Sequence, residues 1–172
     1  ERGKIDWRTL VHAEDMVFLV EFIPSTGEKS MGFRFIPEKA ESCRLTYNRS
    51  RLPQKFLDEY IPNPDPLIQE LDNSITICEQ ALIAGGMTTT AWKEEIAGRN
   101  KTIFVTCQHS FPDADATQMA EMTLTKAWQA DRTDWIEIHR NWWHEYYPQS
   151  FVSISDPVWE SFSSHTVPRV DT

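Results

Sequence analysis

Residues 139–151 read HRNWWHEYYPQSF, and this stretch decides how the last third of the chain folds. It places five aromatic residues and two histidines in thirteen positions. The side chains that share one face at helical spacing are Trp135, Ile138, His139, Trp142 and Tyr146. The spacing therefore predicts a helix whose broad aromatic face packs against a large apolar surface.

This helix has predicted boundaries. It begins at Thr133 or Asp134, because Asp134 and Glu137 stand at the spacing of a capping box. It runs to Tyr147 and ends at Pro148, since proline cannot continue a helix. The sequence thus predicts one long amphipathic helix near the end of the chain.

A second helix is predicted just before it, over residues 115–130. Asp113 or Asp115 is placed to cap it, and residues 131–133 interrupt it. Its apolar and small residues recur at helical spacing: Ala116, Met119, Ala120, Met122, Leu124, Ala127 and Trp128. Two consecutive helices therefore close the chain.

The part of the chain before residue 113 predicts strands. Short runs rich in β-branched or aromatic residues occupy 16–23, the vicinity of Phe33 and Phe35, 42–47, 74–80, 88–93 and 101–108. Two prolines mark residues 63–66 as a loop. No helix-length crossover separates the runs, which favours antiparallel pairing. The predicted fold class is mainly β, an antiparallel β-sandwich followed by two helices.

These predictions divide the chain into three parts. Residues 1–112 form the predicted sandwich domain, residues 113–148 the helical linker, and residues 149–172 an irregular tail. Neither an internal repeat nor a low-complexity segment is evident in the sequence.

Composition excludes several function classes. The 172 residues carry a net charge of −9 from 26 acidic and 17 basic residues, with no Lys/Arg cluster, so no nucleic-acid partner is expected. No apolar run approaches the roughly 18 residues that a membrane-spanning helix needs. Three cysteines without CxxC spacing argue against structural zinc. We therefore expect no cofactor and no membrane partner.

Three stretches of the sequence resemble a known family. The first is EQALIAGG at 79–86, followed by TAW at 90–92; the second is HRNWWHEYY at 139–147. The third is SFVSISD at 150–156, followed by ESF at 160–162. Together they resemble the late sandwich strands, linker helix and barrel entry of bacterial, fucosidase-like six-hairpin glycoside hydrolases.

The resemblance implies a fold and a role. Members have an N-terminal β-supersandwich, a helical linker and an (α/α)6 barrel that holds the catalytic carboxylates, and none of the matched positions corresponds to these. The chain is thus expected to be a non-catalytic sandwich and linker portion that supports a barrel acting on complex glycans. After Phe162 the sequence is polar and unlike a barrel helix, so 149–172 is expected to be a truncated barrel entry. The resemblance favours a periplasmic or secreted protein.

The predicted interface lies on the aromatic helix, at Trp135, Ile138, Trp142 and Tyr146. Its expected partner is the catalytic barrel or, without the barrel, a second copy of the chain, because an uncovered stripe of this size drives self-association. A dimer built on Trp135, Trp142 and Tyr146 should then become a monomer in Trp142→Asp.

An alternative function is that of a free-standing carbohydrate-binding module. Its candidate residues are Trp92, Trp143, Tyr147 and Asp156, because flat aromatic rings stack on sugars and a carboxylate accepts hydrogen bonds from hydroxyl groups. Trp143 lies off the main apolar stripe, which makes it freer than Trp142. Core or interface packing is the competing interpretation for both tryptophans. Asp156 and Glu160 also fit a turn and a helix start.

Three other patterns give weaker indications of a functional site. His139 and His144 are five residues apart, which turns their rings roughly 140° apart on a helix and argues against a zinc site that includes Glu145. His139 is instead predicted to be a hydrogen-bonded packing residue. Cys107 with His109 could form a nucleophilic pair, but a strand cysteine is more typical of a core. Gly85 and Gly86 predict a β-turn.

Overall fold

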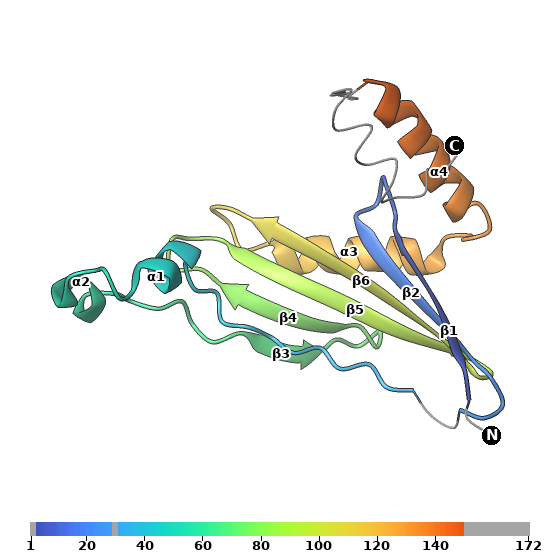
Figure 1. Ribbon diagram of the computed structural model, residues 1–172, viewed down its shortest axis with the longest axis horizontal. Coiled ribbons are helices and arrows are strands. Elements are labelled where there is room, and N and C mark those ends of the chain that lie inside the picture. The colour runs from blue at the N-terminus through green and yellow to red at the C-terminus, as the bar shows by residue number, and fades with distance from the viewer. Residues whose placement is uncertain (1–2, 29–30, 150–172) are drawn as a thin grey trace, which may run out of the picture.

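The computed structural model of the protein describes residues 3–28 and 31–149. Its elements, in chain order, are β1 (Ile5–Val11), β2 (Val17–Pro24), α1 (Cys43–Asn48), α2 (Gln54–Asp58), β3 (Leu67–Glu70), β4 (Thr76–Ala81), β5 (Met87–Ala97), β6 (Asn100–Ser110), α3 (Ala116–Gln129), α4 (Trp135–Tyr146) and the 3-10 helix η1 (Tyr147–Gln149). The strands form one antiparallel sheet in the order β1-β2-β6-β5-β4-β3 (Figure 1). Helix α3 lies across one face of this sheet, and α4 extends away beyond the β1–β2 end.

The predicted antiparallel pairing is present, whereas the residues that the structure describes hold one sheet and not the two of a sandwich. The helix α3 covers one of the two faces of this single sheet. Alternating strands indicate that one face is buried without indicating whether a sheet or a helix buries it. Because α3 shares one hydrophobic core with the strands, the core extends across residue 112, the predicted end of the sandwich domain.

The core lies between α3 and the sheet. Four small or medium side chains of α3 are buried at helical spacing: Ala116, Ala120, Leu124 and Ala127. They pack on strand residues of which Ile77 and Phe104 are completely buried. The buried face is narrower than the pattern predicts, since Met119, Met122 and Trp128 are exposed. Three alanines on this face let the helix approach the sheet closely.

Both C-terminal helices begin where the sequence predicts, but their caps differ. Asp115 and Asp134 occupy the N-cap positions, and neither side chain makes a capping hydrogen bond. The hydroxyl of Ser110 instead accepts hydrogen bonds from the N–H groups of Asp115 and Ala116, at 3.1 and 3.0 Å. The cap of α3 therefore comes from the end of β6, which fixes the helix to the sheet.

Two strand predictions are wrong. The vicinity of Phe33 and Phe35 has no regular secondary structure, although both rings pack on the sheet residue Trp92. Residues 42–47 form α1 instead of a strand: Ser42 is the extended N-cap residue, and the N–H of Thr46 bonds to its carbonyl at 3.1 Å. Only one residue of this run is β-branched, and its Leu45 is buried.

The β-turn predicted at Gly85 and Gly86 is confirmed. Both glycines have positive φ, at 97° and 79°, in the connection between β4 and β5. A Cβ on Gly86 would lie 2.1 Å from the carbonyl oxygen of Ser110. Glycine is therefore required at position 86 by both conformation and space.

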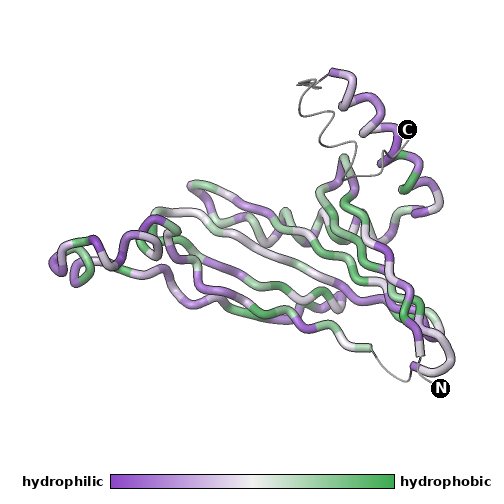
Figure 2. The backbone as a smooth tube through the Cα atoms, in the orientation of Figure 1, coloured by the Kyte–Doolittle hydropathy of each residue, from purple (hydrophilic) through white to green (hydrophobic). Residues whose placement is uncertain are grey.

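The sheet face opposite α3, called the back face here, is covered unevenly. Residues 33–40 lie against β4 and β5, whereas the β1–β2 end carries the exposed side chains Trp7, Val11 and Phe18. Figure 2 shows hydrophobic stretches along these two strands. The back face thus combines a packed region around Trp92 with an open apolar region at one edge. Within residues 3–28 and 31–149, none of the helices has the length and apolar character needed to cross a bilayer.

Candidate functional site

Four aromatic side chains at the end of α4 and the start of η1 form a group that we call the α4 aromatic cluster: Trp142, Trp143, Tyr146 and Tyr147. Two pairs stack, Trp142 on Tyr146 with ring centroids 5.1 Å apart and Trp143 on Tyr147 also at 5.1 Å. The pairs meet edge to face, at 4.9 Å between Trp142 and Trp143. The spacing of four residues within each pair places its rings on neighbouring helical turns.

A hydrogen bond to His139 fixes the orientation of Trp143. The Trp143 Nε1–H donates to His139 Nε2 at 3.0 Å, so the neutral imidazole carries its proton on Nδ1. This confirms the prediction that His139 is a hydrogen-bonded packing residue. Trp143 is partly buried, whereas Trp142 is 37% exposed, so the expectation that Trp143 is the freer of the two is wrong.

The predicted interface residues do not all lie on the surface. Ile138, Trp142 and Tyr146 are exposed along α4. Trp135, in contrast, is only 4% exposed and belongs to the core between α3 and the sheet. Its indole ring lies 4.6 Å from the imidazole of His12, at an interplanar angle of 48°. Trp135 is therefore the anchor of α4, and an interface on this helix excludes it.

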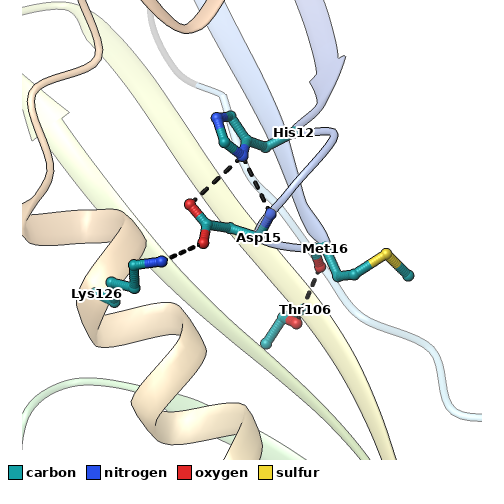
Figure 3. Close-up of polar contacts among 5 residues, drawn as sticks. All are labelled: His12, Asp15, Met16, Thr106 and Lys126. Carbon is teal, nitrogen blue, oxygen red and sulfur yellow. Dashed lines mark hydrogen bonds and ion pairs between the residues drawn. The ribbon is translucent and has the colours of Figure 1, made fainter. Parts of the chain in front are cut away.

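The turn between β1 and β2 supports this anchor. The Asp15 N–H donates to His12 Nδ1 at 3.2 Å, and the Asp15 carboxylate lies 3.4 Å from the same nitrogen (Figure 3). Lys126 on α3 forms an ion pair with the other carboxylate oxygen. The hydrogen bond to Asp15, together with the negative charge of its carboxylate, raises the pKa of Lys126. The cluster thus links the β1–β2 turn to α3.

A second contact holds this turn on the sheet. Met16 adopts a positive φ of 52°, and its carbonyl oxygen accepts a hydrogen bond from Thr106 Oγ1 at 3.1 Å (Figure 3). Sequence reasoning missed the whole arrangement. His12, Asp15 and Lys126 form no recognisable motif, because the fold alone brings residue 126 to residues 12 and 15.

Trp92 lies on the back face of the sheet, 8% exposed. Phe35 stacks on its ring with centroids 4.8 Å apart, and Phe33 meets it edge-on at 6.2 Å. Its surroundings match the core-packing interpretation, because a ring covered by Phe35 has little free surface for a sugar. Helix α4 lies beyond the β1–β2 end of the sheet, away from β5, which carries Trp92 (Figure 1), so the structure does not bring Trp92 together with Trp143 and Tyr147.

The remaining candidate residues do not assemble into a reactive site. Cys107 Sγ accepts a hydrogen bond from Thr90 at 3.7 Å, and His109 Nδ1 lies 3.1 Å from the hydroxyl of Thr88. Each group thus pairs with a threonine of β5, and Cys107 is exposed, contrary to its predicted core position.

The metal and carboxylate candidates give a similar result. No group of three metal-ligating side chains, including His139, His144 and Glu145, gathers within residues 3–28 and 31–149. Asp156 and Glu160 lie outside the described residues.

The comparisons with known proteins do not extend these observations. No family model, no curated protein and no solved structure matches the chain. The function is therefore inferred from the residues and their geometry.

Proposed function

We propose that this chain is a non-catalytic module of a fucosidase-like six-hairpin glycoside hydrolase, where it supports an (α/α)6 barrel acting on complex glycans. The family in this proposal rests on the sequence resemblance, and the α4 aromatic cluster is the observation that carries the docking role. Its rings are ordered by mutual stacking and by the bond from Trp143 to His139. Beyond the anchor Trp135, α4 makes little contact with the other described elements. A helix face with so few contacts inside the chain is better suited to binding a partner than to stabilising the fold.

The energy available at this face is substantial. A fully buried aromatic side chain removes about 150–250 Å² from water, and apolar burial contributes about 25 cal/mol per Å². Trp142 is 37% and Tyr146 44% exposed, so covering these exposed parts would stabilise a complex by roughly 3–5 kcal/mol. The stacked rings also lose little conformational freedom on binding, because neighbouring rings already hold them in place.

The finer fold expectation, a supersandwich, is part of the same proposal. The open apolar end of the back face, at Trp7, Val11 and Phe18, is the surface on which a second sheet would pack. Sheets that pack face to face bury alternate residues of each strand, and these three side chains share one face of β1 and β2.

One observation favours the second candidate function, carbohydrate binding. Tyr147 is 58% exposed at the end of the cluster and presents a phenol ring with a polar tip. Its neighbour Trp143, however, has one ring face stacked on Tyr147 and its N–H donated to His139. Less of the indole therefore remains for a sugar, which makes the docking function the better supported one.

Titration calorimetry with a fucosidase-like (α/α)6 barrel, produced without its own sandwich, tests the proposal. Saturable binding that Trp142→Asp abolishes is expected. His144→Ala, on the opposite side of α4, is the matched control and should bind like the wild type. Barrel binding that is absent, or unchanged in Trp142→Asp, would overturn the docking function.

The chain alone separates the alternatives. It should not hydrolyse aryl glycosides, since the proposal places the catalytic carboxylates in the barrel. Measurable hydrolysis by the purified chain contradicts a non-catalytic role. Glycan binding that is lost in Tyr147→Ala, with no binding to the barrel, would establish the carbohydrate-binding function instead.

A further inference from the structure

We propose that two copies of this chain pair through their β1 strands, antiparallel and centred on Trp7, to form one continuous sheet. The inference does not rest on the proposed function. Strand β1 is an edge of the sheet, and among the described residues no strand pairs with its outer side. Six of its seven residues are exposed, and Trp7 is 69% exposed. Such an edge is a template for another strand.

The backbone shows which groups β1 offers to a partner. The Lys4 carbonyl accepts a hydrogen bond from Ser25 N–H at 2.7 Å, and the His12 N–H donates to the Val17 carbonyl at 2.8 Å. The backbone N–H and C=O groups of even-numbered residues therefore point towards β2, because the direction of these groups alternates along a strand. The N–H and C=O groups of Ile5, Trp7 and Thr9 point outward, where a second strand can bond to them.

Charge excludes a one-residue shift of the register. With Trp7 opposite the partner's Trp7, Asp6 lies opposite the partner's Arg8, and the symmetry repeats this pair. A shift of the two-fold axis by one residue places Asp6 opposite the partner's Asp6, or Arg8 opposite the partner's Arg8. Like charges directly opposite each other destabilise a sheet, and opposite charges stabilise it. The strand is thus complementary to itself in the register centred on Trp7.

The hydrogen bonds and the apolar face agree with this register. The outward-pointing pairs become Trp7 with the partner's Trp7, and Ile5 with the partner's Thr9, and each such pair exchanges both N–H···O bonds. The two indole rings then lie side by side on the back face. There a groove of about 380 Å³, whose lining includes Ile5 and Phe22, offers them an apolar wall.

Charge reversal followed by sedimentation equilibrium is the first experiment. The wild type should dimerise, and Asp6→Arg or Arg8→Glu should each raise the dimer Kd roughly tenfold or more, because each variant creates two like-charge pairs. The double variant Asp6→Arg/Arg8→Glu should restore dimerisation. Circular dichroism checks that Arg8→Glu folds, since Arg8 also lies opposite Glu21 within the chain. A monomeric wild type, or no rescue by the double variant, would overturn the proposal.

Trp142→Asp separates this surface from the α4 aromatic cluster. It should leave the dimer intact, and its conversion to a monomer would place self-association on α4 and refute pairing through β1. Thr9→Pro gives a backbone test, because it removes an outward donor that β2 does not use, while Thr9→Ala keeps that donor. Only the proline variant should lose the dimer.

Disulfide formation tests the register itself. In a Cys43→Ser/Cys107→Ser background, which removes the two exposed cysteines, Ile5→Cys and Thr9→Cys are oxidised separately and as a mixture. The register places these positions about 5.5 Å apart between copies, within disulfide range, but identical positions roughly 14 Å apart. Cross-linking in the mixture alone is expected. Equal cross-linking in all three samples would indicate random collision and overturn the register.

Discussion

The indole of Trp135 and the imidazole of His12 lie with their centroids 4.6 Å apart, and this contact joins the start of α4 to the end of β1. Both side chains are buried, whereas the rest of α4 is largely exposed. One aromatic contact therefore fixes the position of α4, whose other side chains make little contact with the rest of the described fold. It also separates the folding role of this helix from its surface role.

Trp135→Ala should lower the free energy of unfolding by about 3–5 kcal/mol, because it removes a buried indole and leaves a cavity beside His12. Urea unfolding followed by circular dichroism measures the loss. Trp142→Ala is the matched control on the same helix and should cost much less, since Trp142 is partly exposed. Equal losses in the two variants would contradict the anchoring role of Trp135.

Gly86→Ala should destabilise the fold more than Gly98→Ala. Both glycines have positive φ, so alanine at either position costs about 1–2 kcal/mol in backbone strain. A Cβ at position 98 meets open space, whereas one at position 86 collides with the Ser110 carbonyl. Thermal unfolding of the two variants measures the difference, and equal stabilities would show that Ser110 moves away without cost.

The three cysteines should differ in reactivity towards a thiol reagent. Cys43 and Cys107 are exposed, whereas Cys78 is buried. Burial, with the charge of Glu79 as a smaller cause, raises the pKa of the Cys78 thiol and lowers its thiolate fraction. Colorimetric titration should give two fast thiols in the native protein and a third only in denaturant. Three fast thiols in the native state would show that the sheet around Cys78 opens readily.

Asp131, between α3 and α4, should titrate below its ordinary value. The Thr133 hydroxyl donates to the Asp131 carboxylate at 2.6 Å, and the Thr133 N–H donates to it at 3.0 Å. Both bonds lower the pKa of Asp131 below 3.8, and the hydroxyl bond is the larger cause. Carbon NMR titration should show this pKa rising in Thr133→Val, which removes only the hydroxyl donor. Identical titration curves would mean that the hydroxyl bond has no effect in solution.

The lowered pKa of Asp131 also determines the direction in which stability changes with pH. A depressed carboxyl pKa adds stability that is present above the unfolded value of 3.8 and is lost as pH falls through the folded value. The wild type should therefore exceed Thr133→Val in stability at neutral pH, and the difference should shrink below pH 3.8. If the stability difference between the wild type and Thr133→Val stayed the same below this pH, the lowered pKa of Asp131 would not be its cause.

Local patterns in the sequence predict much of this fold. The helices over 116–129 and 135–146 and the strands β2, β4, β5 and β6 lie where periodicity or β-branched content places them. Strands β1 and β3 are missed because β1, although it alternates apolar and polar residues from Ile5 to Arg8, lacks a continuous apolar run, and β3 has only four residues. Residues 42–47 show the opposite error, since their composition suggests a strand and the cap at Ser42 starts a helix.

The candidate site is less accessible to sequence reasoning. The helical spacing that predicts the stripe on α4 cannot show that Trp135 is enclosed by His12, a residue more than a hundred positions away. Nor can it show that Trp143 bonds to His139, or that Trp143 is less exposed than Trp142. Such outcomes depend on tertiary contacts, which a local pattern does not contain.

The pairing of β2 with β6 has a consequence for biosynthesis. This register joins Val17 to Thr106 and Phe22 to Lys101, so the β1–β2 hairpin acquires its neighbour only after residues 101–106 have been translated. Until the ribosome has released β6, the hydrophobic side chains of that hairpin remain in contact with water or with chaperones. We expect the β5–β6 hairpin to form first and the β1–β2 hairpin to pair with it afterwards. Closing the long segment between β2 and β5 carries a larger entropy cost than closing a hairpin turn, and this cost slows the pairing.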